Sequence, residues 1–398
     1  GGIVATMEDG SVPIANGAVA IADGKVAAVG PAAELLDLAP TGELLNAAGC
    51  IILPGLVNTH SHLAMTLLRG LADDLPLKEW LEDHIWPAEK THMNADTVRL
   101  GTELAAAEQL LAGVTTTTDM YFFGDVVCEV LVEAGLRGVV AESLIDFPTP
   151  RCGTTDEMFA KQEELIEAYR DHPLITPSVA AHAPYTVCAK NLVRETELAE
   201  TNGIPMQIHL AETRWEVEKS LEEKGLSPVA YLADLGVLSE RTVAAHCVHV
   251  SSEDIEVLEE FGVGVAHNPV SNLKLASGVS PVPAMSAQGV KLGLGTDGAA
   301  SNNTLDLLRD AQITALLHKG ATGDPTVLPA REIVEMATIG GAKVLGLDHR
   351  IGTLTEGREA DIVCIDVDRV HTTPMYDPFS HLVFAARSGD VRHVLVRG

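Results

Sequence analysis

Short apolar runs rich in β-branched residues alternate with longer amphipathic segments from residue 57 onward. Eight such runs follow one another along the chain, and they read LVNTHSH, TTTTDM, RGVVAESLI, ITPSVAAHA, PMQIHLAE, TVAAHCVH, VGVAHNP and VKLGLGTDG. Runs of this length and composition are typical of buried strands. The pattern therefore predicts eight strands with room for a helix after each.

The segments between the runs carry helical periodicity. In residues 251–262, one of the two opening serines can cap a helix, Ile255, Leu258 and Phe261 share one face, and Gly262 ends it. Eight strand and helix units in succession call for a parallel sheet, and closure into a barrel uses all eight strands without an unpaired edge. We therefore expect an α/β fold built on a (β/α)8 TIM-like barrel.

The two ends of the chain have a different pattern. Residues 1–56 contain short β-like runs broken by EDGS, ADGK and AAGC, and residues 352–398 return to this style with ADIVCIDVD and VRHVLVRG. These two segments predict one small composite β-sandwich domain. The barrel domain is then expected to span residues 57–351.

Charge and composition exclude several classes of partner. The chain has 27 Lys and Arg against 56 Asp and Glu, a net charge of -29 that repels nucleic acid and anionic lipid. No apolar run approaches the roughly 20 residues of a membrane span. The six cysteines form no closely spaced pair typical of disulfide frameworks. We expect a soluble cytoplasmic protein that binds neither nucleic acid nor membrane, and association into a homo-oligomer is compatible with this composition.

Polar residues recur where the predicted strands end. The active sites of such barrels lie at the carboxyl ends of the strands, so these residues carry functional weight. His60 and His62 end strand one on the same side of it, His209 ends strand five, and Asp297 ends strand eight. Three imidazoles and one carboxylate suit one catalytic divalent metal, most simply Zn²⁺, although Fe²⁺ or another first-row metal would accept them.

Two further residues are candidates for chemistry beside the metal. Water bound to a divalent cation has a pKa of roughly 7, so it can lose a proton at neutral pH. Glu212 lies three residues after His209 and could transfer a proton beside the metal. His246 ends strand six and could orient that water or stabilise an oxyanion. Strands four and seven end at His182 and His267.

Several longer motifs resemble the amidohydrolase superfamily, and most closely its 5-methylthioadenosine and S-adenosylhomocysteine deaminases. They are VNTHSHLAMTLLRGLADDLPLKEWLEDHIWPAEK, HAPYTVCAKNL, IHLAET, AHCVH, HNPVSNLKLASG and GTDGAASNN, and they extend over nearly the whole chain. The resemblance implies metal ligands at His60, His62, His209 and Asp297. It also implies the reaction, in which hydroxide adds to the amino-bearing carbon of an adenine ring and ammonia leaves.

The same resemblance implies individual roles around the substrate. Glu212 would pass a proton to the purine ring nitrogen, His246 would act on the attacking hydroxide, and Asp297 would pass a proton to the leaving ammonia. Glu89 and His182 would hold the ribose hydroxyls of a small-molecule nucleoside.

Contacts at the remaining parts of the nucleoside are also implied. Trp80 would pack near the base or the 5′ substituent, and Arg151 would reach the carboxylate of a homocysteine tail. Glu142, at the end of strand three, departs from the pattern because some relatives carry Arg there. This departure weighs against a grip on an amino-acid tail.

Three alternatives compete with the deaminase interpretation. GLGTDG, residues 293–298, has the glycine spacing of a dinucleotide-binding turn, but no strand follows the next helix to complete the βαβ unit. A metal-binding protein without activity would not need Glu212, His246 and Asp297 together. Guanine or cytosine deaminases and triazine hydrolases of the same superfamily are the nearer rivals.

Overall fold

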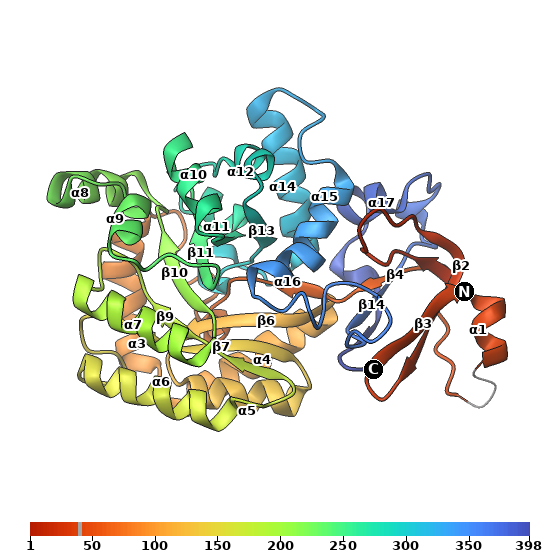
Figure 1. Ribbon diagram of the computed structural model, residues 1–398, viewed down its shortest axis with the longest axis horizontal. Coiled ribbons are helices and arrows are strands. Elements are labelled where there is room, and N and C mark those ends of the chain that lie inside the picture. The colour runs from red at the N-terminus through yellow and green to blue at the C-terminus, as the bar shows by residue number, and fades with distance from the viewer. Residues whose placement is uncertain (39–41) are drawn as a thin grey trace.

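The barrel predicted from the sequence is present in the computed structural model, which describes residues 1–38 and 42–398 (Figure 1). Its strands are all parallel and follow the order of the eight apolar runs, with the fourth run split into two short strands. They are β5 (Leu56–Asn58), β6 (Val114–Tyr121), β7 (Arg137–Leu144), β8 (Ile175–Pro177), β9 (Val179–Ala181), β10 (Met206–Leu210), β11 (Thr242–His246), β12 (Gly264–His267) and β13 (Lys291–Leu294).

Hydrogen bonds between the first and last strands close the barrel. The backbone N–H and the hydroxyl of Thr59 both donate to the carbonyl of Leu294, at 2.9 and 2.8 Å. Just beyond these strand ends, the N–H of Asp297 donates to the carbonyl of His60 at 3.0 Å. The predicted (β/α)8 fold is therefore confirmed, and its closure joins residues that lie more than two hundred positions apart.

Helices surround the barrel in the order that the periodicity predicts. The main ones are α4 (Ala95–Leu111), α5 (Gly124–Ala134), α6 (Thr155–Tyr169), α7 (Ala189–Asn202), α8 (Arg214–Lys224), α9 (Pro228–Asp234), α10 (Ser252–Glu260), α12 (Val282–Gln288) and α14 (Leu307–Thr322). In α10, the hydroxyl of Ser251 caps the N–H of Asp254 at 3.1 Å, Ile255 and Leu258 are buried, and Gly262 follows with φ of 65°.

Both ends of the chain contribute to one separate sheet, as the sequence predicted. Its order is β15 (Val391–Leu395), β14 (Ile362–Asp366), β4 (Cys50–Pro54), β1 (Gly2–Val4), β2 (Ile14–Ala22) and β3 (Lys25–Pro31). All pairs are antiparallel except β1 with β4. The expected sandwich is thus one continuous six-stranded sheet, while the division at residues 56 and 352 stays a prediction.

Strand β4 connects the core of this sheet to the core of the barrel. Its side chains alternate in direction, as they must in a strand. Ile51 and Leu53 belong to the large apolar cluster that contains Leu56 and Val114, whereas Cys50 and Ile52 pack in the smaller cluster of the terminal sheet. The two parts of the fold therefore share a buried apolar junction.

A buried arginine adds a polar connection across the same junction. Arg137, at the start of β7, is fully buried and donates to both carboxylate oxygens of Asp361, at 2.9 and 3.1 Å. It also pairs with Glu359 and donates to the carbonyl of Pro173 at 3.0 Å.

None of the described helices combines the length and the apolar character that a membrane crossing requires.

We predict that Arg137→Met lowers the free energy of unfolding by about 3–5 kcal/mol, because Asp361 stays buried without its cation. Urea unfolding followed by circular dichroism measures the effect. The matched control is Arg99→Met, which removes an exposed arginine that pairs with Glu129 and Glu133 on the surface, and we expect it to change little. A loss for Arg137→Met no larger than for the control would contradict the prediction.

Candidate active site

The four predicted metal ligands come together at the carboxyl ends of their strands. The Nε2 atoms of His60 and His62 lie 3.5 and 3.3 Å from Oδ1 of Asp297, and Nε2 of His209 lies 3.3 Å from Nε2 of His62. His60 forms one group with His62 and Asp297 and another with His209 and His246, and the ligand atoms of each group lie within 4.8 Å of one another.

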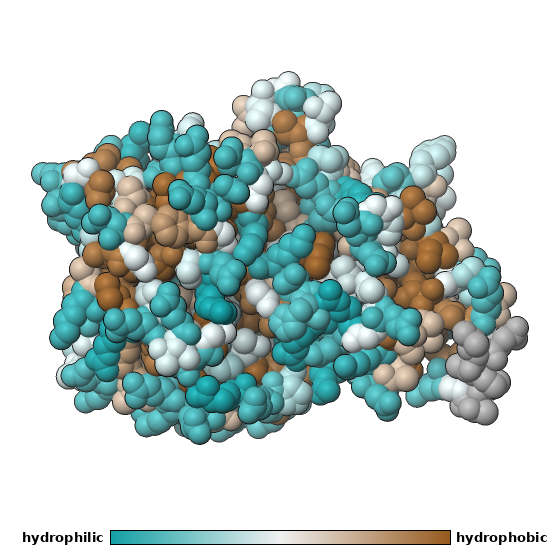
Figure 2. All heavy atoms as spheres, in the orientation of Figure 1, coloured by the Kyte–Doolittle hydropathy of each residue, from teal (hydrophilic) through white to brown (hydrophobic). Residues whose placement is uncertain are grey.

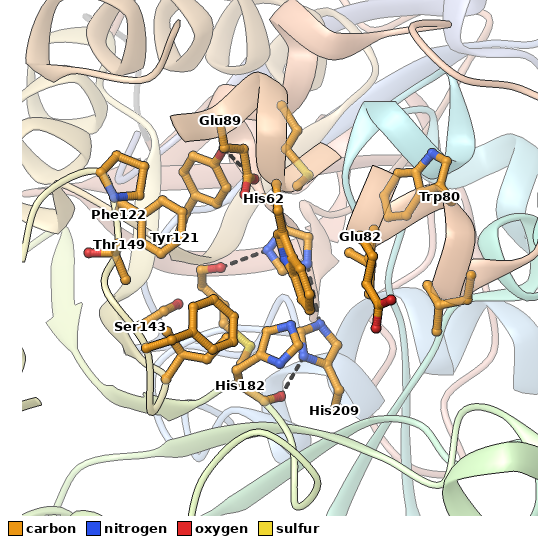
Figure 3. A pocket seen from close by; sticks show the side chains of 18 of the residues that line it. His62, Trp80, Glu82, Glu89, Tyr121, Phe122, Ser143, Thr149, His182 and His209 are labelled. Carbon is orange, nitrogen blue, oxygen red and sulfur yellow. Dashed lines mark hydrogen bonds between the residues drawn. The ribbon is translucent and has the colours of Figure 1, made fainter. Parts of the chain in front are cut away.

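Hydrogen bonds orient two of the imidazoles toward this centre. Nδ1 of His62 lies 2.7 Å from the carbonyl of Met120, and Nδ1 of His209 lies 2.6 Å from the carbonyl of His182 (Figure 3). A carbonyl can only accept, so Nδ1 carries the proton in both rings and Nε2 offers its lone pair to the centre. These contacts fix the tautomer that a metal ligand needs.

The third imidazole has a buried ring nitrogen without a hydrogen-bond partner. Nε2 of His60 is buried and makes no hydrogen bond, although buried polar atoms are rarely left unpaired. A divalent cation at the centre would satisfy this nitrogen and relieve the crowding of the inward-facing Nε2 atoms. Three nitrogens with one carboxylate are a donor set that such ions accept, so the residues fit a divalent metal.

Asp297 is held by serine hydroxyls on its other side. Oδ2 accepts hydrogen bonds from Ser271 at 2.6 Å and from Ser301 at 3.1 Å. Burial alone would raise the pKa of this carboxyl, but His60 and His62 hold the pKa well below its usual range. Asp297 is therefore an oriented carboxylate that faces the imidazoles with one oxygen.

Glu212 and His246 lie beside the four ligands. Nε2 of His246 is 3.8 Å from Oε2 of Glu212 and 3.9 Å from Oδ2 of Asp297, while its Nδ1 lies 2.7 Å from the side-chain oxygen of Asn272. The hydroxyl of Ser277 donates to Oε1 of Glu212 at 3.1 Å. Burial raises the pKa of Glu212.

The backbone is strained where these side chains leave their strands. Ala211, His246 and Asp297 have φ of 50°, 74° and 62°, in the left-handed region that costs residues other than glycine free energy. Each of them lies at or just after the end of a barrel strand. The strain is concentrated at the positions that direct the candidate site.

A cavity of about 600 Å³ opens above the ligands. Of the predicted substrate-binding residues, Glu89, His182 and Trp80 line it, and Arg151 does not. Glu89 accepts a hydrogen bond from the hydroxyl of Tyr121 at 2.6 Å, and burial raises its pKa to about 7. Burial lowers the pKa of His182 to about 3, and its Nδ1 lies 2.8 Å from the hydroxyl of Thr186. Trp80 is buried on the opposite wall from Ser143 and Thr149 (Figure 3).

Arg151 does not line the cavity. Its guanidinium pairs with Asp125 and with Glu142, and the Glu142 side chain is buried. Burial raises the pKa of Glu142 to about 7 against the opposing effect of Arg151. The structure therefore separates Arg151 from the site residues that the sequence predicted together with it.

Sequence reasoning missed most of the aromatic wall. Six of the 15 aromatic side chains line the cavity, and they are Trp80, Trp86, Tyr121, Phe122, Phe147 and Tyr185. Only Trp80 was predicted, although the rarity of aromatic residues in this chain could have drawn attention to the others. Asn272 and Ser277 lie in the motif HNPVSNLKLASG, and the sequence alone indicates no role for either.

Comparisons with known proteins place these observations in a family. A model of the amidohydrolase family matches residues 51–398, and a model of a bacterial imidazolonepropionase-like composite domain matches residues 17–41. A crystal structure of a zinc-bound adenosine deaminase from Xanthomonas campestris is 40% identical, with a TM-score of 0.96, and the match covers 100% of this chain and 90% of that one.

Other relatives agree on the family. A 5-methylthioadenosine/S-adenosylhomocysteine deaminase from Syntrophobacter fumaroxidans is 48% identical over 100% of this chain and 90% of its own length. A zinc-bound atrazine chlorohydrolase from Arthrobacter aurescens is 26% identical with a TM-score of 0.92, covering 100% of this chain and 92% of that one. The chain therefore belongs to the amidohydrolase family, in the branch of the 5-methylthioadenosine/S-adenosylhomocysteine deaminases.

Proposed function

We propose that this protein is a metal-dependent hydrolase that deaminates the adenine ring of 5′-modified adenosines. Water replaces the exocyclic amino group, so the products are the inosine derivative and ammonia. The observation that carries the proposal is the convergence of Glu212 and His246 on Asp297 and the other metal ligands, in a cavity of about 600 Å³. The names of the curated relatives support the same reaction.

We propose that the metal is zinc, held by His60, His62, His209 and Asp297. Zinc is supported by the nitrogen-rich donor set and by the zinc-bound neighbours, while iron or another first-row metal would accept the same ligands. When bound, such an ion lowers the pKa of water to roughly 7 and so supplies a nucleophile at neutral pH.

The side chains around the ring divide the proton transfers. Glu212 protonates the ring nitrogen next to the amino-bearing carbon, and the pKa of its carboxyl, raised by burial, favours this role. His246 stabilises the charge that develops on the attacking oxygen. Asp297 takes a proton from the attacking water and passes it to the departing ammonia.

The outer part of the cavity holds the sugar. Glu89 and His182 bind the ribose hydroxyls, and Trp80 packs near the base or the 5′ substituent. Guanine or cytosine deamination and triazine hydrolysis are less well supported, because those substrates carry no ribose for Glu89 and His182.

All six cysteines, which lie within the described residues, are free thiols, and this supports a cytoplasmic location.

A steady-state comparison tests the proposal directly. Methylthioadenosine, S-adenosylhomocysteine, 5′-deoxyadenosine and adenosine are compared with guanine, cytosine and a chlorotriazine, with metal content assayed on the same preparation. We expect a fall in absorbance near the adenine maximum with release of ammonia. Turnover of only the free bases or the triazine would overturn the proposal.

We predict that Glu212→Gln keeps its metal but loses activity by ~10²–10⁴-fold, because the amide cannot deliver a proton to the ring. Turnover and metal content are measured on one sample. Glu218→Gln makes the same change at an exposed position of α8 and serves as the control. Equal turnover in Glu212→Gln and the parent would refute the proton-transfer role.

We predict that His60→Ala lowers the bound metal well below that of the parent and lowers the melting temperature, because the ion stabilises the folded state that binds it. Elemental analysis and differential scanning calorimetry measure both effects. His84→Ala, at an exposed position outside the site, should retain the parent's metal content. Full metal content in His60→Ala would exclude this residue as a ligand.

We predict that KM for nucleosides rises as pH falls through about 7, because Glu89 becomes protonated and is then a weaker hydrogen-bond acceptor for the ribose hydroxyls. The hydrogen bond from Tyr121 lowers the pKa of Glu89, so Tyr121→Phe should move the inflection to higher pH. Steady-state kinetics across this range measure it, with Glu82→Gln at the exposed rim as the control. An inflection that Tyr121→Phe leaves in place would contradict the assignment to Glu89.

A further inference from the structure

We propose that this enzyme favours adenosines with a short, uncharged 5′ substituent over those with an amino-acid tail, because Arg151 is held outside the cavity by Asp125 and Glu142. The inference rests on the proposed deaminase function and specifies its substrate class. It assigns Arg151, Asp125 and Glu142 as specificity-determining residues that act through one ion-pair cluster.

Both terminal nitrogens of Arg151 already bind carboxylates. Nη1 and Nη2 bind the two carboxylate oxygens of Asp125, at 2.6 and 2.8 Å, and Nη1 also binds Oε2 of Glu142 at 3.0 Å. The guanidinium carbon lies 5.3 Å from the centre of the Phe123 ring. A bidentate pair that also stacks on an aromatic ring fixes a guanidinium more firmly than a single contact does.

The backbone turn around Arg151 is fixed as well. The hydroxyl of Thr149 accepts the N–H of Cys152 at 2.9 Å and the N–H of Arg151 at 3.3 Å. The N–H of Thr149 donates to the carbonyl of Cys152 at 2.9 Å. Thr149, the first residue of this turn, lines the cavity (Figure 3), whereas Arg151 does not.

The acids that hold Arg151 are anchored in turn. Oε2 of Glu142 accepts the N–H of Gly124 at 2.9 Å, at the first residue of α5, and its side chain is 1% exposed. Asp125 is the next residue of the same helix. If Arg151 moved to a ligand, Glu142 would lose its cation while buried, which is an unfavourable exchange. The cluster therefore opposes recruitment of Arg151.

The wall next to Thr149 offers no cation to a charged tail. Besides the hydroxyl of Ser143, it consists of Ile145, Phe147, Pro148 and Pro150, and Phe122 lies on the same side of the cavity as Thr149 (Figure 3). A methylthio or methyl group gains contact there, whereas a carboxylate would lose water without receiving a cationic partner. Among the described residues that line the cavity, Lys90 is the one lysine or arginine, and it is exposed at the rim where water screens it.

The test compares kcat/KM for methylthioadenosine and S-adenosylhomocysteine with the metal-loaded parent enzyme. We expect methylthioadenosine to be preferred at least tenfold, which corresponds to about 1.4 kcal/mol, with 5′-deoxyadenosine also ahead of S-adenosylhomocysteine. A smaller preference, or the reverse, overturns the inference while the deaminase function stands. Failure to deaminate any of the three nucleosides overturns the proposed function itself.

Two variants separate the ion-pair explanation from a merely tight cavity. In Arg151→Gln the ratio of the two kcat/KM values should stay within about twofold of the parent's, as in the control Arg194→Gln, which breaks an equivalent arginine pair with Asp156 over the Phe159 ring. A selective loss for S-adenosylhomocysteine in Arg151→Gln overturns the inference.

Asp125→Asn tests the opposite direction. Asp125 is half exposed, so its replacement should leave the fold intact while weakening the bidentate pair. We expect kcat/KM for S-adenosylhomocysteine to rise relative to methylthioadenosine, because a guanidinium released from Asp125 can turn toward the tail. A ratio unchanged from the parent's would show that the cluster does not control the choice.

Discussion

The hydrogen bonds that close the barrel between β5 and β13 are the constraint on which the site depends. Thr59 binds the carbonyl of Leu294 through two donors, and the N–H of Asp297 binds the carbonyl of His60. These contacts bring a histidine pair from one end of the barrel sequence beside an aspartate from the other. Without this closure, β5 and β13 would be the opposite edges of an open sheet, and His60 and His62 would lie far from Asp297.

Closure brings the ligands near one another, and local hydrogen bonding decides how they point. The carbonyls of Met120 and His182 each accept a hydrogen bond from Nδ1 of a nearby imidazole, that of His62 and that of His209. His246 and Asp297 adopt left-handed backbone conformations that residues other than glycine seldom occupy. The free energy that the barrel gains from its buried core offsets this strain, so the rigidity of the scaffold and the geometry of the site are linked.

The sequence predicts the fold and the ligand set for a physical reason. Parallel strands of a barrel end at one edge, so polar residues that end apolar runs, such as His60 and Asp297, must approach one another. It does not predict the partners of Arg151, since Asp125 lies 26 positions away on a helix and Glu142 on a strand. The tautomer of His209 and the φ of His246 depend equally on tertiary contacts that no local pattern encodes.

The excess of acids over cations gives the buried arginines a common role. With 27 Lys and Arg against 56 Asp and Glu, a carboxylate that folding buries must compete for a scarce cation or become protonated. Arg137 neutralises Asp361 where the barrel meets the terminal sheet, and Arg151 neutralises Glu142 behind the cavity wall. A cation committed to a buried acid is removed from ligand binding, so the charge balance of the whole chain constrains what its active site can recognise.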